Sequence, residues 1–208
     1  MSTLKIWGRM TSINVKKVIW TAQELGLDFE RHEAGGVHGV VKTPGYMALN
    51  PNSQVPTLED GDYVLWESNV ITRYLSAKYS MGHLYPEHLK ERFDAERWME
   101  WQQTLVNPAS RNGFWHLIRL PADQRDPALV AQSNAAVEPL MALLDAHLAN
   151  RSFMVGERFT MADIPLGCEV QRWLGLPQAR VKRPNIERWF ASLLARPAAK
   201  GVLDLALA

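Results

Sequence analysis

The sequence of 208 residues predicts an α/β unit of order βαβαββα followed by a unit made of helices alone. Strand and helix patterns alternate over the first part of the chain, and only helical patterns follow. The two regions are separated by residues 81–87, where Gly82 and Pro86 break regular structure. We therefore expect two domains, at residues 1–80 and 88–208.

Hydrophobic periodicity predicts the first three elements. Residues 4–7 alternate apolar and polar side chains, which indicates a strand. Apolar residues then recur at helical spacing from Val15 to Leu25, and Gly26 is a typical helix stop. Residues 28–32 suit a second strand. Because a helix connects them, the two strands are expected to run parallel.

The rest of the first unit contains a hairpin between two helices. A short helix is expected over residues 44–49 and a strand over 55–58. The Asp-Gly pair at 60–61 predicts a tight turn, so residues 63–66 form an antiparallel partner strand. A helix over 68–79 closes the unit. This order gives a small mixed sheet covered by helices, which is the thioredoxin-like arrangement.

The second unit contains four stretches with helical periodicity. Residues 88–107 predict a long helix that ends before Pro108, because a proline interrupts the backbone hydrogen bonds of a helix. Further helices are expected over 128–148, 161–175 and 185–195. Their polar and apolar faces indicate helices packed around a shared core.

Thr160 and Asp163 have the spacing of a capping-box variant. In such a box the two side chains satisfy backbone groups at a helix start. We expect both to stabilise the beginning of the helix over 161–175 and assign them no role in chemistry.

Charge and cysteine content exclude several classes of protein. Lys and Arg total 23 against 22 Asp and Glu, and the net charge of +1 gives no electrostatic argument for a nucleic-acid or acidic-membrane partner. Cys168 is the single cysteine, so no intramolecular disulfide can form and a cysteine-based metal site is disfavoured. Residues 1–7 lack a signal-peptide pattern, and no apolar run is long enough to cross a bilayer. We expect a cytoplasmic protein that binds no metal, membrane or nucleic acid.

The first candidate site comprises Thr11, Ser12 and Asn14, between the first predicted strand and helix. Backbone N–H groups at a helix start are unpaired, and the helix dipole favours negative charge there. A hydroxyl at this position can donate a hydrogen bond to an anion. The alternative is that Ser12 or Thr11 only caps the helix, which is the commoner role of such a residue.

The second candidate is Val55-Pro56, at the start of a predicted strand. Proline removes a hydrogen-bond donor from a sheet, so it belongs at an edge or a special turn. A cis bond would turn the Val55 backbone toward a ligand. Only about 5–6% of X–Pro bonds are cis, so the local sequence by itself favours trans.

The third candidate is the pair Glu67 and Ser68, at the start of the helix over 68–79. Ser68 and the free N–H groups of the first helical turn can bind a carboxylate, and Glu67 can accept a hydrogen bond from an ammonium group. An α-amino acid end, which carries both groups on one carbon, suits this pair. The alternative is a helix cap beside a solvated acid.

The order and spacing of these candidates resemble one known family. Residues 50–62 (Asn-Pro-Asn-Ser-Gln-Val-Pro-Thr-Leu-Glu-Asp-Gly-Asp) and 65–75 closely resemble the glutathione-site segment of cytosolic glutathione transferases. Residues 160–163 resemble the capping box of that family's helical domain, and residues 11–15 resemble the serine-type active-site turn of its theta and phi classes. The resemblance spans nearly the whole chain. It implies a glutathione-binding thioredoxin-like domain and an all-helical domain that shapes a second-substrate pocket, in a bacterial or plant-like class.

The resemblance also implies roles for individual residues. The backbone of Val55 pairs with the cysteinyl part of glutathione, and Pro56 fixes the turn through a cis bond. Glu67 and Ser68 hold the γ-glutamyl end, in agreement with the interpretation above. Two further positions correspond to contacts with the glycine end or the neighbouring backbone: Lys42 and Gln54.

Ser12 corresponds to the catalytic hydroxyl, which donates a hydrogen bond to the glutathione sulfur. Asn14 is a further catalytic candidate, and Thr11 is an adjacent hydroxyl. A free thiol with a pKa near 8.5 is roughly 3% ionised at pH 7. Lowering that pKa to about 6.5 requires about 2.7 kcal/mol, which a charge-assisted hydrogen bond and a helix N-terminus can supply together. Cys168 is far from this turn in the sequence, which disfavours a mixed-disulfide mechanism.

The implied activity is the conjugation of the glutathione thiolate to a small hydrophobic electrophile by a homodimer. Glutathione is then a substrate, and no cofactor is expected. The alternatives are another glutathione-dependent enzyme (an isomerase, dehalogenase or peroxidase) or a non-catalytic binding module. The electrophile pocket is expected between the first turn and the first long helices. Its candidate residues are Met10, Asn107, Arg111, Phe114, Trp115 and Arg119.

Overall fold

A four-stranded mixed sheet forms the centre of the N-terminal part of this computed structural model, which describes residues 3–208. Its strands lie in the order β2-β1-β3-β4. β1 and β2 are parallel, as the intervening helix requires, whereas β3 is antiparallel to both β1 and β4. The predicted thioredoxin-like arrangement is confirmed. The strands are β1 Leu4–Trp7, β2 Phe29–His32, β3 Thr57–Asp60 and β4 Tyr63–Trp66.

The hairpin between β3 and β4 turns one residue later than the sequence suggested. Asp60 is the last residue of β3 and pairs with Tyr63, so the two-residue loop consists of Gly61 and Asp62. Gly61 has a φ of +65°. Glycine is favoured at the first position of such a loop, because a left-handed backbone there matches the twist of the strands.

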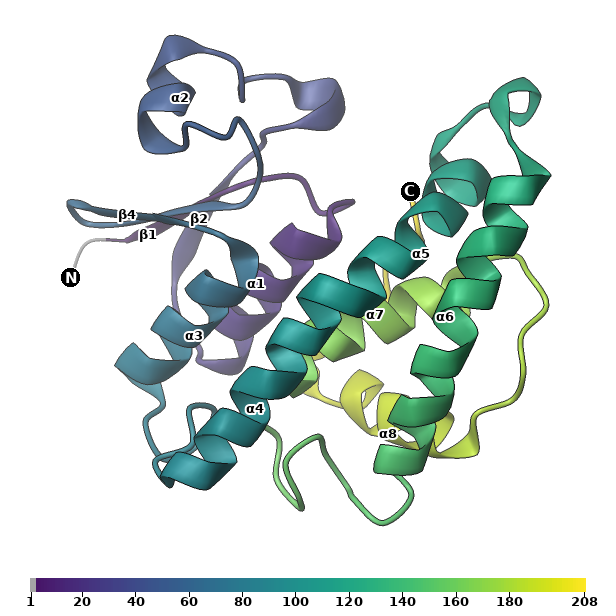
Figure 1. Cartoon of the computed structure of the whole chain (residues 1–208). Coiled ribbons are helices and arrows are strands. Elements are labelled where there is room, and N and C mark those ends of the chain that lie inside the picture. Colours follow the sequence, from purple (N-terminus) through teal and green to yellow (C-terminus); the bar gives the residue numbers. More distant parts are fainter. Residues whose placement is uncertain (1–2) are drawn as a thin grey trace.

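Helices lie on both sides of this sheet (Figure 1). α1 (Ile13–Glu24) and α3 (Ser68–Tyr79) pack against each other on one face, and the short α2 (Pro44–Leu49) lies on the other. The apolar side chains of α1 predicted by periodicity are buried, among them Val15, Val18 and Ile19. The N-terminus of α1 therefore has a fixed position relative to the end of β1.

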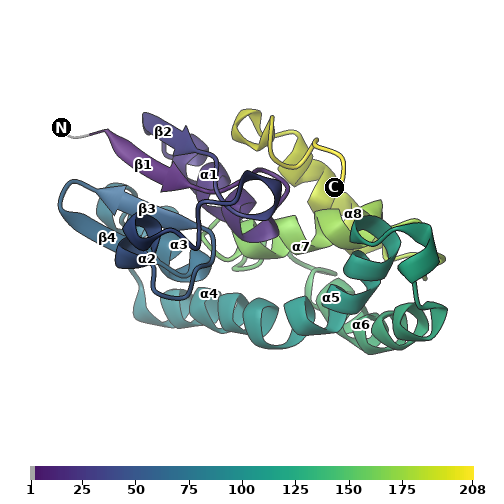
Figure 2. The same cartoon turned by 90° about the horizontal axis from the view of Figure 1, so that it is seen from above.

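The remaining helices form the second part of the molecule. None of the helices within residues 3–208 is long and apolar enough to cross a membrane. Viewed from above, the long helical stretch that starts with α4 runs along one side, and α7 lies between it and α8 (Figure 2). The helices are α4 Leu89–Trp101, α5 Asn107–Phe114, α6 Pro127–His147, α7 Asp163–Gly175 and α8 Pro184–Leu194.

The prediction that the first long helix ends before Pro108 was wrong. The helix continues from α4 through a π-helical segment, Gln102–Val106, directly into α5, which contains Pro108 in its first turn. The N–H of Asn107 bonds to the carbonyl of Gln102, five residues back instead of four. Pro108 has no N–H to donate to the preceding turn of the helix. The wider π-helical turn before it accommodates the missing hydrogen bond, so the helix continues.

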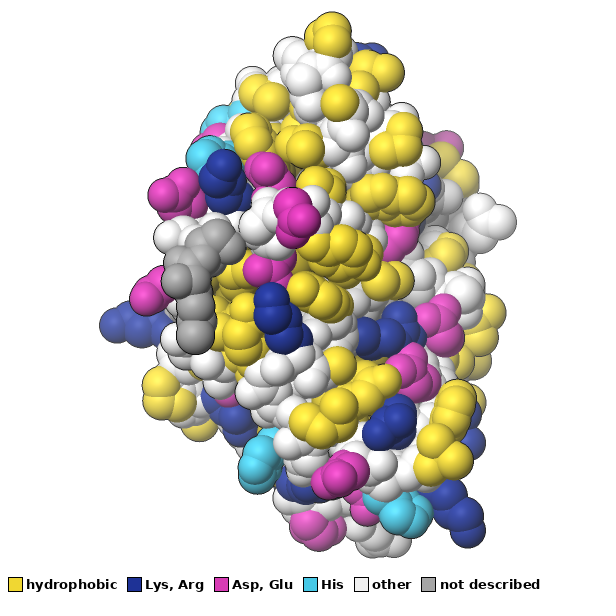
Figure 3. Space-filling view, turned by 90° about the vertical axis from the view of Figure 1, so that its left-hand side faces the viewer, with side chains coloured by type: hydrophobic (Ala, Val, Ile, Leu, Met, Phe, Trp, Pro, Cys, Tyr) yellow, Lys and Arg dark blue, Asp and Glu magenta, His cyan; other side chains and the backbone are white. Residues whose placement is uncertain are grey.

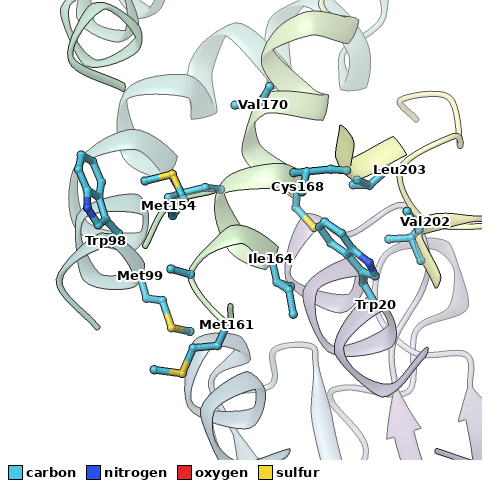
Figure 4. Packing of buried hydrophobic residues seen from close by; sticks show 14 of the residues in the cluster. Trp20, Trp98, Met99, Met154, Met161, Ile164, Cys168, Val170, Val202 and Leu203 are labelled. Carbon is cyan, nitrogen blue, oxygen red and sulfur yellow. The ribbon is translucent and has the colours of Figure 1, made fainter. Parts of the chain in front are cut away.

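One hydrophobic core connects the two parts of the molecule. Trp20 of α1 belongs to the same buried cluster as Ile164, Cys168 and Val170 of α7 (Figure 4). Every residue of α7 from 163 to 173 is buried. A helix that is buried on all sides holds its neighbours in place, so α7 fixes α1 relative to the helical part.

Asp163 connects the start of α7 to two other segments. Its carboxylate accepts hydrogen bonds from the Thr160 backbone N–H at 2.8 Å and the Met154 backbone N–H at 2.9 Å. It also accepts from Trp189 Nε1 of α8 at 2.9 Å. Burial raises the pKa of Asp163 to about 6, and these hydrogen bonds act in the opposite direction. The predicted capping box is therefore present, and it also anchors α8.

Candidate functional site

A cavity of about 250 Å³ lies where the N-terminus of α1 meets the helical part of the molecule. Four segments line it: the turn after β1, the loop before β3, the stretch from α5 to residue 119, and α7. Both parts of the chain therefore contribute side chains. The lining residues are Arg9, Thr11, Ser12, Ile13, Asn14, Gln54, Asn107, Arg111, Phe114, Trp115, Arg119 and Arg172.

Ser12 occupies the N-cap position of α1, but its side chain makes no capping hydrogen bond. Its backbone is extended, with φ −89° and ψ 123°, and its carbonyl accepts the first helical bond from the Lys16 N–H at 3.0 Å. Capping is what a serine hydroxyl at this position ordinarily does. Here the hydroxyl is left available in the cavity wall, next to the unpaired N–H groups of the first turn.

The other two polar residues of this turn also line the cavity. Asn14 has a buried Oδ1 that lacks a hydrogen-bond partner among residues 3–208. Thr11 is exposed, and its carbonyl accepts a hydrogen bond of 2.8 Å from Arg119 Nη2. All three polar groups thus lie at one helix start, and the choice of thiolate donor among them stays a prediction.

The loop before β3 is held by side chains from α2 and its C-terminal end. The Val55–Pro56 bond is cis, which confirms the prediction. Tyr46 Oη donates to the Gln54 carbonyl at 2.6 Å, and Asn50 Nδ2 donates to the same carbonyl at 3.0 Å. Asn50 Nδ2 also donates to Thr57 Oγ1 at 3.2 Å. These contacts explain why residues 50–58 form one sequence block: the polar side chains fix the Gln54 and Val55 backbone beside the cavity.

Glu67 and Ser68 lie at the junction of β4 and α3. Glu67 is exposed and has a φ of +73°, a strained conformation for a residue with a side chain. Such strain concentrates at functional sites. Ser68 is the first residue of α3 and is buried. The pair therefore has the expected arrangement, an accessible carboxylate beside the free N–H groups of a helix N-terminus.

A buried lysine that the sequence did not predict lies beneath this junction. Lys17 of α1 donates from Nζ to Gln102 Oε1 at 2.9 Å, to Gln103 Oε1 at 3.3 Å and to Ser68 Oγ at 3.5 Å. Burial lowers the pKa of Lys17 to about 8, partly offset by the nearby Glu169. A positive charge thus lies directly behind Ser68, and it adds to the attraction of this helix start for a carboxylate.

Six of the sequence-predicted residues do not line the cavity, namely Met10, Lys42, Val55, Pro56, Glu67 and Ser68. Met10 packs against the hydrophobic core. Lys42 is exposed in the segment before α2. Conversely, Arg9, Ile13 and Arg172 line the cavity although the sequence did not indicate them. The position of Arg9 in the turn after β1 is a sequence signal that predicts a place in the cavity wall. No such signal exists for Arg172, which reaches the cavity only because of how α7 packs.

The fold and the cavity define a class of protein. A thioredoxin-like unit presents a free hydroxyl and a helix N-terminus to a cavity, and a helical unit closes the other side of that cavity. Two family models match the chain. The glutathione S-transferase N-terminal domain matches residues 2–77, and the glutathione S-transferase C-terminal domain matches residues 101–197. The chain belongs to the glutathione S-transferase family, as its sequence resemblance predicted.

Similar proteins come from bacteria and plants. Glutathione S-transferase GstB of Escherichia coli is 37% identical over 202 residues, which are 96% of this chain and 97% of that protein. Glutathione S-transferase 3 of Zea mays is 34% identical, over 95% of this chain and 92% of that protein. A crystal structure of the theta class glutathione S-transferase from Xanthomonas axonopodis pv. citri, with glutathione bound, has a TM-score of 0.96 and 42% identity over the full length of both chains.

Proposed function

We propose that this protein is an enzyme that binds glutathione, stabilises its thiolate at Ser12 and transfers it to a small electrophile. The observation that carries the proposal is the Ser12 hydroxyl, which sits at a helix N-terminus in the cavity wall without capping the helix. Asn14 and Thr11 are neighbouring donors. The names of the similar bacterial and plant proteins support the same activity.

The proposed glutathione site extends from the cavity to the start of α3. The backbone of Val55, next to the cis bond, pairs with the cysteinyl part. Glu67 receives the ammonium of the γ-glutamyl end, and Ser68 with the free N–H groups of α3 receives its carboxylate. Gln54 and Lys42 are proposed for the glycine end. Residues 1–80 then form the glutathione-binding domain and residues 88–208 the domain that completes the second-substrate pocket.

Incubation with glutathione and a general aryl halide, such as 1-chloro-2,4-dinitrobenzene, tests the activity directly. We expect formation of the thioether well above the uncatalysed rate, measured by absorbance and confirmed by mass spectrometry. Tight binding of glutathione without turnover of any electrophile in a broad panel would contradict the enzymatic proposal and favour a binding module.

Replacing Ser68 with alanine is expected to weaken glutathione binding about tenfold, because a charge-assisted hydrogen bond to the γ-glutamyl carboxylate is lost. Isothermal titration calorimetry measures the change. Ser192 of α8, whose hydroxyl bonds to the Trp189 carbonyl at 2.6 Å, offers a matched control: Ser192→Ala should leave the affinity unchanged. Equal affinities for wild type and Ser68→Ala would contradict the role of Ser68.

We further propose a cytoplasmic homodimer. β4 and α3 lie on the side of the molecule that faces the viewer in Figure 3, where hydrophobic side chains recur across the surface. Exposed fractions are 38% for Trp66, 41% for Val70 and 63% for Phe93 of α4. Large apolar side chains exposed together indicate an interface. A two-fold axis would bury this surface on both subunits.

Light scattering at micromolar concentration is expected to give twice the chain mass of 23.6 kDa. Phe93→Asp should shift the mass toward that of the monomer, because the pairing surface then carries a charge that must be desolvated. Val181, 54% exposed in the segment before α8, provides the control Val181→Asp, which should remain dimeric. A monomer mass for the wild type would rule out the dimer.

A further inference from the structure

The cavity wall is rich in arginine. Arg9 comes from the turn after β1, Arg111 from α5, Arg119 from the end of the helical stretch, and Arg172 from α7. Within the part of the chain that the structure describes, the lining of this cavity contains no Asp or Glu. Four guanidinium groups thus surround a space of about 250 Å³ without an acidic side chain in its wall.

The charge of Arg172 is balanced within the protein. Its Nη1 lies 3.4 Å from Glu169 Oε1, 3.1 Å from Asn107 Oδ1 and 3.3 Å from Ser110 Oγ. Its guanidinium also lies over the Phe114 ring, 4.6 Å from the centroid. The guanidinium of Arg172 is therefore held by partners within the protein and is not counted among the groups available to a ligand.

The other three guanidinium groups have no carboxylate within 4.0 Å among residues 3–208. Arg119 donates to the Thr11 carbonyl and lies 5.2 Å from the centre of the Phe114 ring. Arg9 Nε is buried and lacks a hydrogen-bond partner within the same range. Arg9 also fills space that Gly35 leaves open, because a Cβ at Gly35 would lie 2.6 Å from Arg9 Nη1.

Three of the positive charges in this wall, those of Arg9, Arg119 and Arg172, are close enough to oppose one another. Burial lowers the pKa of Arg119, and repulsion from Arg9 and Arg172 lowers it further. Guanidinium groups stay protonated at physiological pH, so the repulsion persists until an anion enters. Arginine is also the side chain best shaped to hold a carboxylate through two parallel hydrogen bonds.

The two carboxylates of glutathione do not use these groups in the proposed binding mode. The γ-glutamyl carboxylate lies at Ser68 and the start of α3, and Lys42 is proposed for the glycine end. Ser68 and Lys42 are absent from the cavity lining, and Gln54, the other residue proposed for the glycine end, lines it but carries no charge. The arginines therefore remain available to a second molecule that shares the cavity with the glutathione sulfur.

We infer that the second substrate is an electrophile that carries a carboxylate or a similar anionic group. Its anion lies between Arg111 and Arg119, with Arg9 nearby, and its apolar part packs on Phe114 and Trp115. This inference rests on the proposed function and narrows its substrate class. It also explains why the pocket combines aromatic rings with positive charge.

The probe 4-chloro-3-nitrobenzoate has both features, and 4-chloro-3-nitrobenzamide is its neutral counterpart. In either reaction the thiolate sulfur attacks the ring carbon that bears chlorine. The new C–S bond forms, the C–Cl bond breaks, and chloride leaves with the bonding electron pair. The thiol proton has already passed to solvent when the thiolate formed. The two probes share ring, nitro group and leaving group, and they differ in charge at one position.

The experiment compares kcat/KM for the two probes, each divided by its uncatalysed rate with glutathione. The wild type should favour the benzoate by about tenfold or more, the value of one good guanidinium–carboxylate contact. Arg111→Gln and Arg119→Gln should each lower this preference about tenfold. Arg97→Gln, on the exposed side of α4, is the control and should leave the preference unchanged. Added salt should reduce the preference of the wild type for the benzoate, because dissolved ions reach the cavity and screen the attraction between its guanidinium groups and the carboxylate.

A preference near one that neither Arg111→Gln nor Arg119→Gln changes would overturn this inference, while turnover of the benzamide would still support the proposed function. An equal loss of both activities in these variants would also overturn it, because the arginines would then act on glutathione or on the fold. Failure of the wild type to turn over either probe while it conjugates 1-chloro-2,4-dinitrobenzene would overturn this inference alone. Failure with every electrophile of the broad panel, despite binding of glutathione, would overturn the proposed function as well.

Discussion

Ser12→Ala is expected to raise the pKa of the bound glutathione thiol toward its free value of about 8.5 and to lower conjugation at pH 7 by up to about 20-fold. The hydroxyl lies at the N-cap of α1 and makes no capping bond, so it is free to donate to sulfur. Without that donor the thiolate retains only the helix N-terminus. The ionised fraction of the thiol at pH 7 then falls from about three quarters toward the roughly 3% of a free thiol.

Two measurements test this expectation together. The ultraviolet absorbance of the thiolate, followed across a pH titration of the glutathione complex, gives the pKa, and an aryl halide assay gives turnover. Thr11→Ala and Asn14→Ala are the matched variants, and both should have smaller effects. If Asn14→Ala moves the titration and Ser12→Ala does not, the donor is Asn14, which also lines the cavity wall.

Asp163→Ala is expected to lower the free energy of unfolding by about 4 kcal/mol, because several buried donors lose their acceptor at once. The Thr160 and Met154 backbone N–H groups and Trp189 Nε1 would all remain buried without a partner. Urea unfolding followed by circular dichroism measures the change.

Asp126 supplies the control for this substitution. It caps α6 by accepting from the Ala128 N–H at 2.8 Å, but it is exposed, so Asp126→Ala should cost only about 1 kcal/mol. Equal losses in the two variants would mean that Asp163 is an ordinary helix cap. A loss under 1 kcal/mol at Asp163 would contradict its anchoring role.

Asp163 should also make stability depend on pH. Burial raises its folded-state pKa to about 6, above the ordinary value of 3.8. Between these values the folded state binds more protons than the unfolded state, so stability falls as pH rises. The contribution of Asp163 protonation to the free energy of unfolding is fully present below pH 3.8, and it is lost as pH rises through about 6. The difference in unfolding free energy between wild type and Asp163→Asn should follow this curve, and a flat difference would contradict it.

Local sequence patterns locate a candidate site where it consists of neighbouring residues, although they do not decide the role of those residues. Ser12 and Glu67 both precede helices, and Val55-Pro56 precedes a strand, so local turn and capping rules locate each of them. Residues 50–58 owe their shape to contacts within the block, such as Asn50 with Thr57. Information of this kind is present in a short stretch of sequence.

Local rules failed where distant segments meet. Lys17 interrupts the apolar stripe of α1, which suggests an exposed side chain, yet Gln102 and Gln103 supply acceptors that permit its burial. Arg172 reaches the cavity because α7 is enclosed by the other helices. Pro108 stops a regular helix, but the preceding π-helical segment changes the bonding pattern. Each outcome depends on partners that the local pattern does not contain.

Cys168 is fully buried, and burial raises its pKa to about 12. Thiol–disulfide exchange requires a thiolate that can reach its target, so this residue is inert toward oxidised glutathione in the folded protein. The ultraviolet absorbance of the Cys168 side chain also stays constant between neutral and mildly alkaline pH, because its thiol remains protonated over that range. The folded protein consequently contributes no cysteine thiolate absorbance of its own over this pH range. Any thiolate signal that appears on adding glutathione belongs to the ligand, and no cysteine-free variant is needed to observe it.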